Sequence, residues 1–302
     1  MAQDILDTST EATTAPQQTT TLSDRARRRR RTAILKHAGL IAFVALMLYP
    51  LLWLVVSAFK PENLILTDPS IVPSQISLDN FRDGWTALNQ PFWVFFVNSL
   101  IVTIGAILGN LFSCSLTAYA LARLEFRARG LYFGIVLVSV MLPIHVLIIP
   151  QYIVFSQLGF ANTFIPLVLP KFLATDAFFI FLMIQFIRGI PRELDQAAWL
   201  DGTGPFRTFW YVVLPLMRPA LVTTTIFTFI WTWNDFFTPL IYLTKSQVFT
   251  VPVALSSMVD SETSTGVGML LAMSVLSLIP IMLFFGFAQK YLIRGIATTG
   301  LK

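Results

Sequence analysis

Long apolar runs separated by short polar segments form the main pattern along this chain. A helix needs about 20 mostly apolar residues to cross the hydrocarbon core of a bilayer. Six runs reach that length, so the pattern predicts an all-α integral membrane protein with six transmembrane helices. The expected spans are residues 36–58, 94–119, 131–155, 164–187, 219–243 and 269–289.

The positive charges indicate how these spans are oriented. Arg25, Arg27–Arg31 and Lys36 come directly before the first run, and further arginines occupy every second connection after it. Cytoplasmic loops carry an excess of Lys and Arg, so we expect both termini in the cytoplasm. The cluster fits such an anchor better than a signal peptide, because no convincing small-residue cleavage site follows the run. The positive charges outside this scheme are Lys60, Arg82, Lys171 and Lys245.

The polar segments divide the chain into parts. The first of them is rich in Thr, Ser, Gln and Ala, and such a segment cannot bury enough apolar surface to become ordered. A short link near Gly159 and Asn162 predicts a tight hairpin between the third and fourth spans. The expected parts are a disordered cytoplasmic tail with the arginine cluster (1–32), the first transmembrane helix (33–60), an extracytoplasmic loop (61–92), a five-helix permease core with the loop 188–218 (93–290) and a cytoplasmic C-terminal tail (291–302).

The composition supports a membrane protein and excludes other classes. Hydrophobic residues make up 55% of the 302 residues and charged residues 12%, about half of the roughly 25% that soluble domains carry. We assign the net charge of +5 to membrane orientation rather than to nucleic-acid binding. Cys114 is the single cysteine, and His37 and His145 lie far apart, so we expect neither an intrachain disulfide nor a metal site.

The loop 188–218 has the local signals of two short helices. Pro191 suits the first turn of a helix, where Glu193 and Asp195 would complement the helix dipole. Asp201 and Gly202 are expected to end this helix, since glycine readily adopts the left-handed conformation.

A second helix is expected to begin at Pro205 and to stop before Pro215. In the first helix, Ala197 and Ala198 share an apolar face with Leu194 and Leu200. Two alanines on an exposed face would allow a partner surface to approach closely.

The residues of this loop resemble a known signature. Gln196-Ala197-Ala198, Gly202, Val212 and Leu214-Pro215 stand at the spacing of the EAA motif of binding-protein-dependent ABC importer permeases. The sequence departs from the motif at Gln196, where glutamate is usual. The resemblance implies an ATPase-coupling loop that contains Glu193, Asp195, Gln196, Ala197, Ala198, Asp201, Gly202, Leu214 and Pro215.

Segments elsewhere are similar to the carbohydrate-uptake branch of that family, in particular to the smaller permease subunit of maltose-type importers. The similarity extends over residues 36–302. The segments that carry it are Tyr49–Trp53, Ser57–Lys60, Asn98–Leu100, Ala118–Arg123, Leu158–Thr163, Trp233–Phe236, Pro239–Leu240 and Gln289–Tyr291 with Gly295, Gly300 and Lys302.

The resemblance implies a type I ABC importer permease in the bacterial cytoplasmic membrane that carries a carbohydrate, such as a di- or oligosaccharide. Its implied partners are a second permease subunit, two ATPase subunits and an extracytoplasmic sugar-binding protein. The chain has no GxxxxGK[ST] loop, so we expect no bound cofactor and no enzyme activity of its own, with ATP and Mg held by the ATPase subunits.

Five polar or aromatic residues within the spans are candidates for the substrate pathway. Trp233, Asn234 and Asp235 combine hydrogen-bonding groups with a ring on which a sugar can stack. His145 could line the pathway or be a neutral packing residue, and Asp176 could line it or pair with Lys171.

Three other functions compete with sugar import. A permease of the same superfamily for a non-sugar solute would keep the loop but not the carbohydrate-type segments. A channel or secondary transporter would leave the loop unexplained. A membrane-embedded enzyme is disfavoured, because no Ser-His-Asp or HExxH arrangement is visible.

Overall fold

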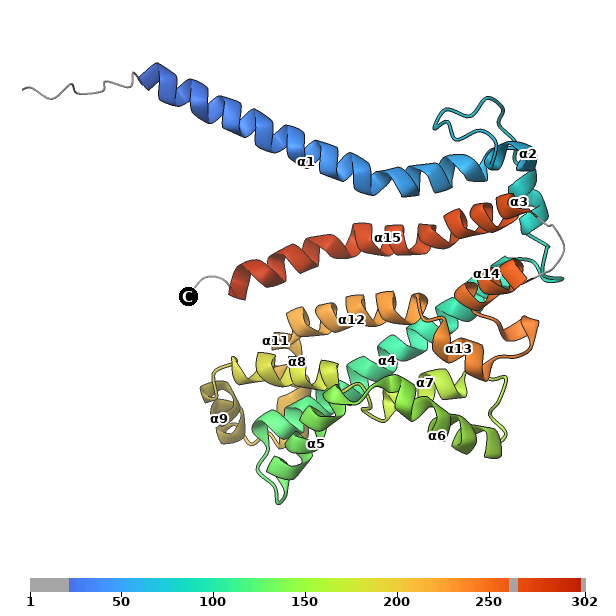
Figure 1. The fold of residues 1–302 in the computed structure, drawn as a ribbon. Helices are drawn as coiled ribbons and strands as arrows, with labels where there is room; N and C mark the ends of the chain where they lie inside the picture. Colours follow the sequence, from blue (N-terminus) through green and yellow to red (C-terminus); the bar gives the residue numbers. More distant parts are fainter. Residues whose placement is uncertain (1–21, 261–265, 300–302) are drawn as a thin grey trace, which may run out of the picture. The chain divides into compact units, whose positions relative to one another are not determined.

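The computed structural model describes the backbone of residues 22–260 and 266–299, and every regular element in those ranges is helical. The expected all-α fold is therefore confirmed for the described residues (Figure 1). Four helical stretches are long and apolar enough to cross a membrane, and two bent helix pairs raise the number to six if each pair is one span. The four stretches are Arg29–Ala58, Trp93–Arg123, Ile165–Arg188 and Val267–Tyr291.

The chain divides into two compact units, and the first ends at Trp53. Its described part belongs to a single helix, α1 (Leu22–Ala58), in which Leu35, Ile41 and other apolar side chains are exposed, as suits lipid. Residues 22–32, expected to be disordered, are helical instead. Arg, Ala and Leu are good helix formers, and no glycine or proline interrupts them before Gly39. The rest of the expected tail, residues 1–21, lies outside the described residues.

The second unit begins at Leu54, and the expected extracytoplasmic loop 61–92 has its own structure there. It contains two short helices, α2 (Glu62–Ile65) and α3 (Asp79–Gly84). The buried Lys60 donates hydrogen bonds to the carbonyl oxygens of Asp68 and Ser70. Hydrogen bonds from the side chain and backbone of Ser70 lower the pKa of Asp68.

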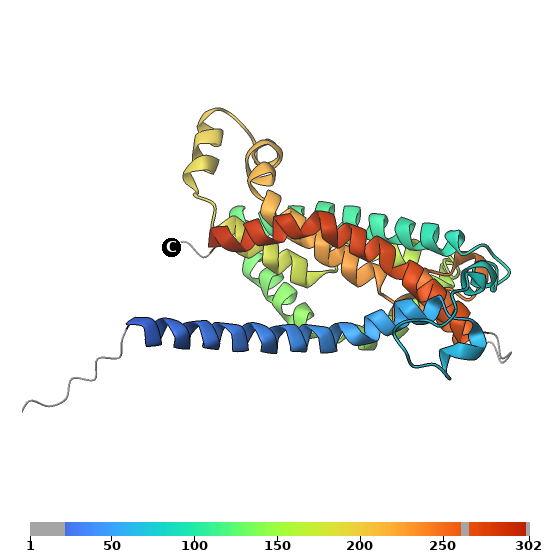
Figure 2. The ribbon, with the colours of Figure 1, turned by 90° about the horizontal axis from the view of Figure 1, so that it is seen from above.

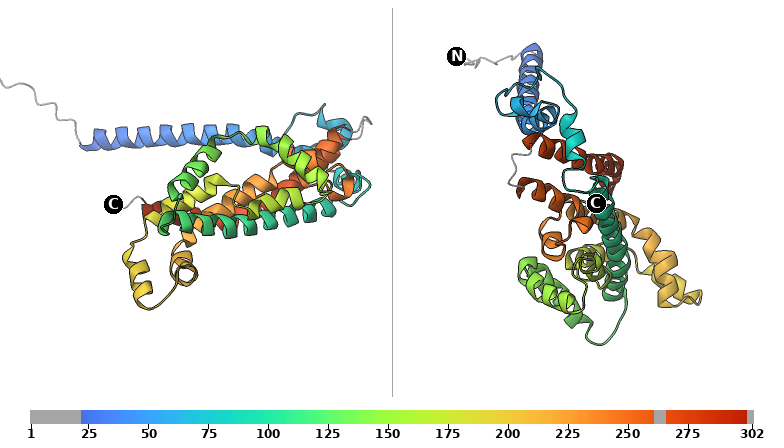
Figure 3. Two further views of the ribbon diagram at one scale, coloured as in Figure 1. Left: turned by 90° about the horizontal axis from the view of Figure 1, so that it is seen from below. Right: turned by 90° about the vertical axis from the view of Figure 1, so that its right-hand side faces the viewer.

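The centre of the second unit is α4 (Trp93–Arg123), which corresponds to the expected second span. It packs against α7 (Ile165–Phe172), α8 (Ala177–Arg188) and α12 (Arg218–Trp233) (Figure 1, Figure 3). This one helix therefore positions three later helices directly.

The expected third and fourth spans each contain a break between two helices. The third consists of α5 (Arg129–Met141) and α6 (Ile144–Gln157), bent by 105°. Pro143 lies at this bend, where it has no N–H for a helical hydrogen bond and disfavours helix in the residue before it. The fourth is interrupted between α7 and α8, where Ala174 has a φ of 57°.

The fifth expected span, 219–243, is also broken. It consists of α12 and α13 (Phe237–Tyr242), with Asn234–Phe236 between them. The carboxylate of Asp235 accepts a hydrogen bond from the N–H of Thr238 at 3.1 Å. Such local side-chain bonds compete with the helical hydrogen bonds, so the two polar residues end one helix and start the next.

The remaining elements complete the unit. α14 (Val251–Asp260) is tied to α4, because Ser99 accepts a hydrogen bond from the N–H of Val251. The last span, α15 (Val267–Thr299), packs against α3 and α12. It continues through most of the segment 291–302 that we expected to be a separate tail, since no proline follows Pro280. Residues 300–302 lie outside the described residues.

Candidate functional site

The loop 188–218 contains the two helices that the sequence predicts, with one shift at its start. The first helix, α9 (Glu193–Leu200), begins after Arg192, so that Pro191 precedes the helix instead of lying in its first turn. Gly202 has a φ of 79°, as predicted for the turn that ends the helix. The hydroxyl of Thr203 closes this end by donating a hydrogen bond to the carbonyl oxygen of Ala198 at 2.6 Å.

The second helix of the loop is longer than expected. It comprises α10 (Pro205–Thr208), a π-helical turn (Phe209–Val213) and α11 (Leu214–Leu216). The prediction that it stops before Pro215 is wrong. A proline inside an α-helix clashes with the carbonyl four residues earlier, and the wider π turn before Pro215 relieves that clash. The helix bends by 75° only where it meets α12.

The two sides of α9 differ from the predicted arrangement. Asp195 and Ala198 are buried, whereas Glu193, Gln196 and Ala197 are exposed. The expected exposed face with both alanines is therefore corrected, because Ala198 points into the chain. The most exposed large apolar side chains on this loop are Leu200, Phe206 and Tyr211, which are 89%, 67% and 80% exposed.

The last turn of α4 holds the first half of the loop. The Arg123 Nε lies 3.1 Å from the Asp195 Oδ2, and the two side chains are 4% and 7% exposed. The Arg123 Nη2 donates hydrogen bonds to the carbonyl oxygens of Ile187 and Ile190, at 2.9 and 2.6 Å. One guanidinium therefore joins the end of α8, the start of the loop and α9.

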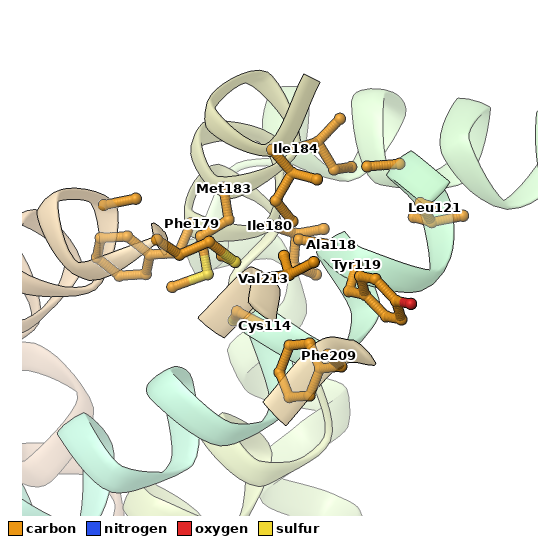
Figure 4. Close-up of a cluster of buried hydrophobic side chains, with 14 residues drawn as sticks. Cys114, Ala118, Tyr119, Leu121, Phe179, Ile180, Met183, Ile184, Phe209 and Val213 are labelled. Atoms are coloured by element: carbon orange, nitrogen blue, oxygen red, sulfur yellow. The ribbon is translucent and has the colours of Figure 1, made fainter. Parts of the chain in front are cut away.

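One turn earlier, α4 holds the second half. The Tyr119 hydroxyl donates a hydrogen bond to the carbonyl oxygen of Pro205 at 3.0 Å, and its ring packs on Phe209 at 5.2 Å between centroids. Figure 4 shows both rings in the buried cluster formed by α4, α8 and this part of the loop, with Val213 beside them. Two other predicted residues lie in this part of the loop. Leu214 is half-buried, and Pro215 is exposed.

A hollow of about 750 Å³ lies beside this junction. One of its walls is α9, and another is the connection that follows α4. The lining residues are Arg123, Leu124, Glu125, Phe126, Arg192, Asp195, Gln196, Trp199 and Pro205.

Asp176, a candidate for the substrate pathway, pairs with Lys171 at the break in the fourth span. The Lys171 Nζ lies 2.9 Å from both carboxylate oxygens, and the Asn110 Nδ2 donates to the Asp176 Oδ2 at 2.7 Å. Both charged side chains are about one quarter exposed. Gly109 allows this approach, since a Cβ there would lie 2.8 Å from the Cβ of Lys171.

The three candidates in the fifth span lie in different environments. Trp233 is buried and stacks on Phe229 at 5.7 Å between centroids. Asn234 is exposed, and its amide donates to the carbonyl oxygen of Ile230 in its own helix. Asp235 is half-buried and bound to the backbone of α13. Asn234 is thus the most exposed of the three, and Trp233 is the most buried.

His145 is exposed and meets Phe237 edge to face, with 4.8 Å between ring centroids. This contact places α6 beside α13. Asp176 bonds to α4 and α7, whereas His145 packs on α13. The candidate residues therefore do not form one cluster.

Reasoning from the sequence missed the roles of Arg123 and Asn110. Arg123 was noted as a positive charge and as the end of the segment Ala118–Arg123. Its position at the end of an apolar run, 72 residues before Asp195, gives no sign of that partner. Asn110 had a usable signal, because a polar amide within an apolar span must find a partner. In the ranges that the structure describes, no group of three or more His, Cys, Asp or Glu side chains could hold a metal ion.

The chain is similar to known transport proteins over most of its length. It is 33% identical over 265 residues to the arabinooligosaccharides transport system permease protein AraQ of Halalkalibacterium halodurans, covering 87% of this chain and 93% of that one. It is 30% identical to the diacetylchitobiose uptake system permease protein NgcG of Streptomyces coelicolor, covering 86% of each. It is also 30% identical to the sn-glycerol-3-phosphate transport system permease protein UgpE of Salmonella typhi, covering 89% and 97%.

The fold is that of a solved transporter. The structure matches a chain of a bacterial ABC transporter involved in the import of the acidic polysaccharide alginate, with a TM-score of 0.77 and 22% identity. The match covers 88% of this chain and 98% of the other. Residues 109–298 match the model of the binding-protein-dependent transport system inner membrane components, and the chain belongs to that family.

Proposed function

We propose that this chain is the membrane-spanning permease subunit of an ATP-driven importer that carries a carbohydrate, such as a di- or oligosaccharide, into the cytoplasm. The observation that carries the proposal is the loop 188–218, a folded two-helix element that is bonded to α4 on one side and exposes Leu200, Phe206 and Tyr211 on the other. Such an element suits the transfer of force from a soluble partner to the spans.

The partners follow from the family. A binding-protein-dependent system uses a soluble protein to deliver the substrate, and we propose two ATPase subunits and a second permease subunit beside it. ATP and Mg would bind to the ATPase subunits and not to this chain. Both termini and the loop 188–218 would then lie in the cytoplasm, where the excess of Lys and Arg places them.

The names of the relatives support a sugar as the substrate. AraQ and NgcG are named for the transport of arabinooligosaccharides and diacetylchitobiose. UgpE is named for sn-glycerol 3-phosphate, so a phosphorylated polyol belongs in any substrate screen. Within this chain, Asn234 and His145 are the exposed polar candidates for substrate contact, and the remaining candidates, Trp233, Asp235 and Asp176, would act by supporting the pathway.

The test is transport by the purified complex in proteoliposomes. The chain would be co-purified with its cognate permease and ATPase subunits. The complex would be supplied with the cognate binding protein and a panel of labelled arabinotriose, diacetylchitobiose, maltotriose and sn-glycerol 3-phosphate. We expect uptake of a sugar that requires both the binding protein and MgATP.

Each control separates one alternative. A non-hydrolysable ATP analogue should abolish uptake, and uptake that persists with it would indicate a channel or a secondary transporter. Uptake of sn-glycerol 3-phosphate alone would overturn the sugar assignment but keep the importer. An absence of ATP-dependent uptake together with an absence of stimulated ATPase activity would overturn the proposal as a whole.

A further inference from the structure

The last two turns of α4 hold the loop 188–218 at both of its helices. Arg123 contacts Asp195 in α9 and the carbonyl oxygens of Ile187 and Ile190, and Tyr119 donates to the carbonyl oxygen of Pro205 at the start of α10. Figure 2 shows α9 and the segment 205–216 standing out together from α8 and α12. The base of this projection is therefore fixed to α4, while its far side is free.

Arg123 and Asp195 line the hollow beside the loop, but their contact with each other is almost fully buried. Arg123 and Asp195 are 4% and 7% exposed, so neither side chain is available to a protein that docks on the loop. Asp195 thus differs from its neighbours Glu193 and Gln196, whose side chains are exposed. Its carboxylate belongs to the attachment of the loop and not to its docking surface.

A guanidinium suits such an attachment better than other side chains. Its donors point in fixed directions from one plane, so it can hold several acceptors in one geometry. Here it fixes two backbone carbonyls and one carboxylate, which lie on three successive parts of the chain. A displacement of α9 must then move the end of α4 with it or break a buried ion pair.

We infer that Arg123 is a positioning residue that transmits movement of the loop 188–218 to α4. The inference rests on the proposed function, in which ATPase subunits move this loop. α4 packs against α7 and α8 of the fourth span and against α12 of the fifth, so its displacement reaches two other spans directly. The predicted role is mechanical, since the Arg123 side chain is buried among groups of this chain.

One detail of the pair allows a clean test. Within the described chain, the Asp195 Oδ1 is buried and accepts no hydrogen bond, and the Arg123 Nε faces the carboxylate without a well-aligned one. The two side chains are thus held together mainly by charge. Replacing both with apolar residues of similar size removes the ion pair without leaving a buried charge unpaired, which is far milder than removing one partner alone. The carbonyl oxygens of Ile187 and Ile190 lose one donor in this variant.

The experiment compares the purified complex with the variant Arg123→Met/Asp195→Leu, the conservative variant Arg123→Lys, and Arg127→Met as a matched control. Arg127 is an exposed arginine on the connection between α4 and α5, four residues after Arg123. ATPase activity would be measured with and without the binding protein loaded with the best-transported sugar of the panel. Hydrogen–deuterium exchange would follow the amides of α9 and of residues 119–123, without nucleotide and after trapping with MgATP and vanadate.

For Arg123→Met/Asp195→Leu we expect normal assembly, and the basal ATPase activity of each variant is the reference for its stimulation. The stimulation by the loaded binding protein should fall by about 5- to 150-fold, the range that coupling between two sites spans. Trapping should then alter exchange in α9 but no longer at residues 119–123. Arg123→Lys keeps the charge but loses the planar set of guanidinium donors, so its stimulation should be intermediate. The stimulation of Arg127→Met should match that of the parent protein.

The possible outcomes separate this inference from the proposed function. Full stimulation in the double variant would overturn the inference and leave the importer intact. A complex that fails to assemble in both Arg123 variants would show a structural role alone, which also overturns it. If the parent complex shows no stimulation at all, the proposed function fails. The hydrogen–deuterium exchange of α9 measured without nucleotide then decides whether Arg123 attaches the loop to α4. Faster exchange of α9 in the double variant than in Arg127→Met would support the attachment, and equal exchange would refute it.

Discussion

The two ion pairs of the helical core, Arg123–Asp195 and Lys171–Asp176, differ in a way that their places in the sequence do not suggest. The first joins a span to a polar loop, where water should be near, yet its side chains are 4% and 7% exposed. The second lies within an apolar run, yet its side chains are 25% and 24% exposed. The pair at the loop is sealed by the chain, and the pair in the span is not.

The difference indicates what each pair needs. The Arg123 guanidinium has its acceptors within this chain, so the attachment of the loop is complete in one subunit. The open sides of Lys171 and Asp176 must face water or another protein, because charged groups in contact with lipid are costly. The span therefore presents a polar face that a partner subunit or a water-filled pathway has to cover.

The largest expected effect is the loss of one partner from the sealed pair. Asp195→Ala leaves the Arg123 charge buried and unpaired, which costs about 3–5 kcal/mol of stability. The temperature at which the purified complex unfolds should fall accordingly. Asp201→Ala, which removes an exposed carboxylate from the same loop, is the control and should change little. Equal stability of the two variants would show that the Arg123–Asp195 contact is not an ion pair in the assembled protein.

A smaller effect is expected in the open pair. Lys171→Met removes the main partner of Asp176, but the carboxylate keeps the Asn110 amide and its exposed side. We expect a loss of about 1–3 kcal/mol, which is typical when a partly satisfied buried group loses one partner. The unfolding temperature of the complex measures this loss of stability. Lys245→Met, which changes an exposed lysine, is the control. A loss as large as that of Asp195→Ala would show that the two pairs are equally sealed in the complex, and would end the contrast between them.

Local signals in the sequence account for much of the fold. The six apolar runs predict the spans, and Gly202 and Pro205 predict the turn and the second helix of the loop, because each acts through its own backbone geometry. The break at Ala174 has no such signal. It lies just after the close approach of α7 to α4 at Gly109, and a contact between segments so distant in the chain cannot be derived from the pattern of either one.

The candidate site divides in the same way. The loop helices were predictable, and their orientation was not. Ala198 and Asp195 face inward because Arg123 and Tyr119 of α4 hold that side of the loop, and these contacts are long-range. Helical periodicity identifies which residues share a face, but tertiary contacts decide which face is covered.

The turn of the loop provides a test that involves strain alone. A Cβ on Gly202 would meet nothing within 4 Å, so Gly202→Val causes no clash but forces a φ of 79° on a β-branched residue. That conformation costs about 1–2 kcal/mol. We expect faster hydrogen exchange in α9 and reduced coupling of ATP hydrolysis to transport, with normal membrane insertion. Gly204→Ala is the control, because Gly204 has a φ of −78° and equal space. Normal coupling in Gly202→Val would count against the loop as the docking element.

The free side of the loop gives the smallest effect on stability and the sharpest separation from the sealed pair. Leu200 is 89% exposed, so Leu200→Ser should change the free energy of unfolding by no more than about 0.5 kcal/mol. If an ATPase subunit covers this side chain, the substitution removes about 1.5–3 kcal/mol of apolar burial from the contact, and the affinity for the ATPase subunit should fall by tenfold or more. Leu66→Ser, at the other end of the spans and 79% exposed, is the matched control and should leave that affinity unchanged. An Asp195 variant that loses stability beside a Leu200 variant that loses only ATPase binding would divide the loop into an attached side and a docking side. If Leu200→Ser binds the ATPase subunit as tightly as the parent protein does, the docking surface lies elsewhere on the loop, and the division fails at that residue.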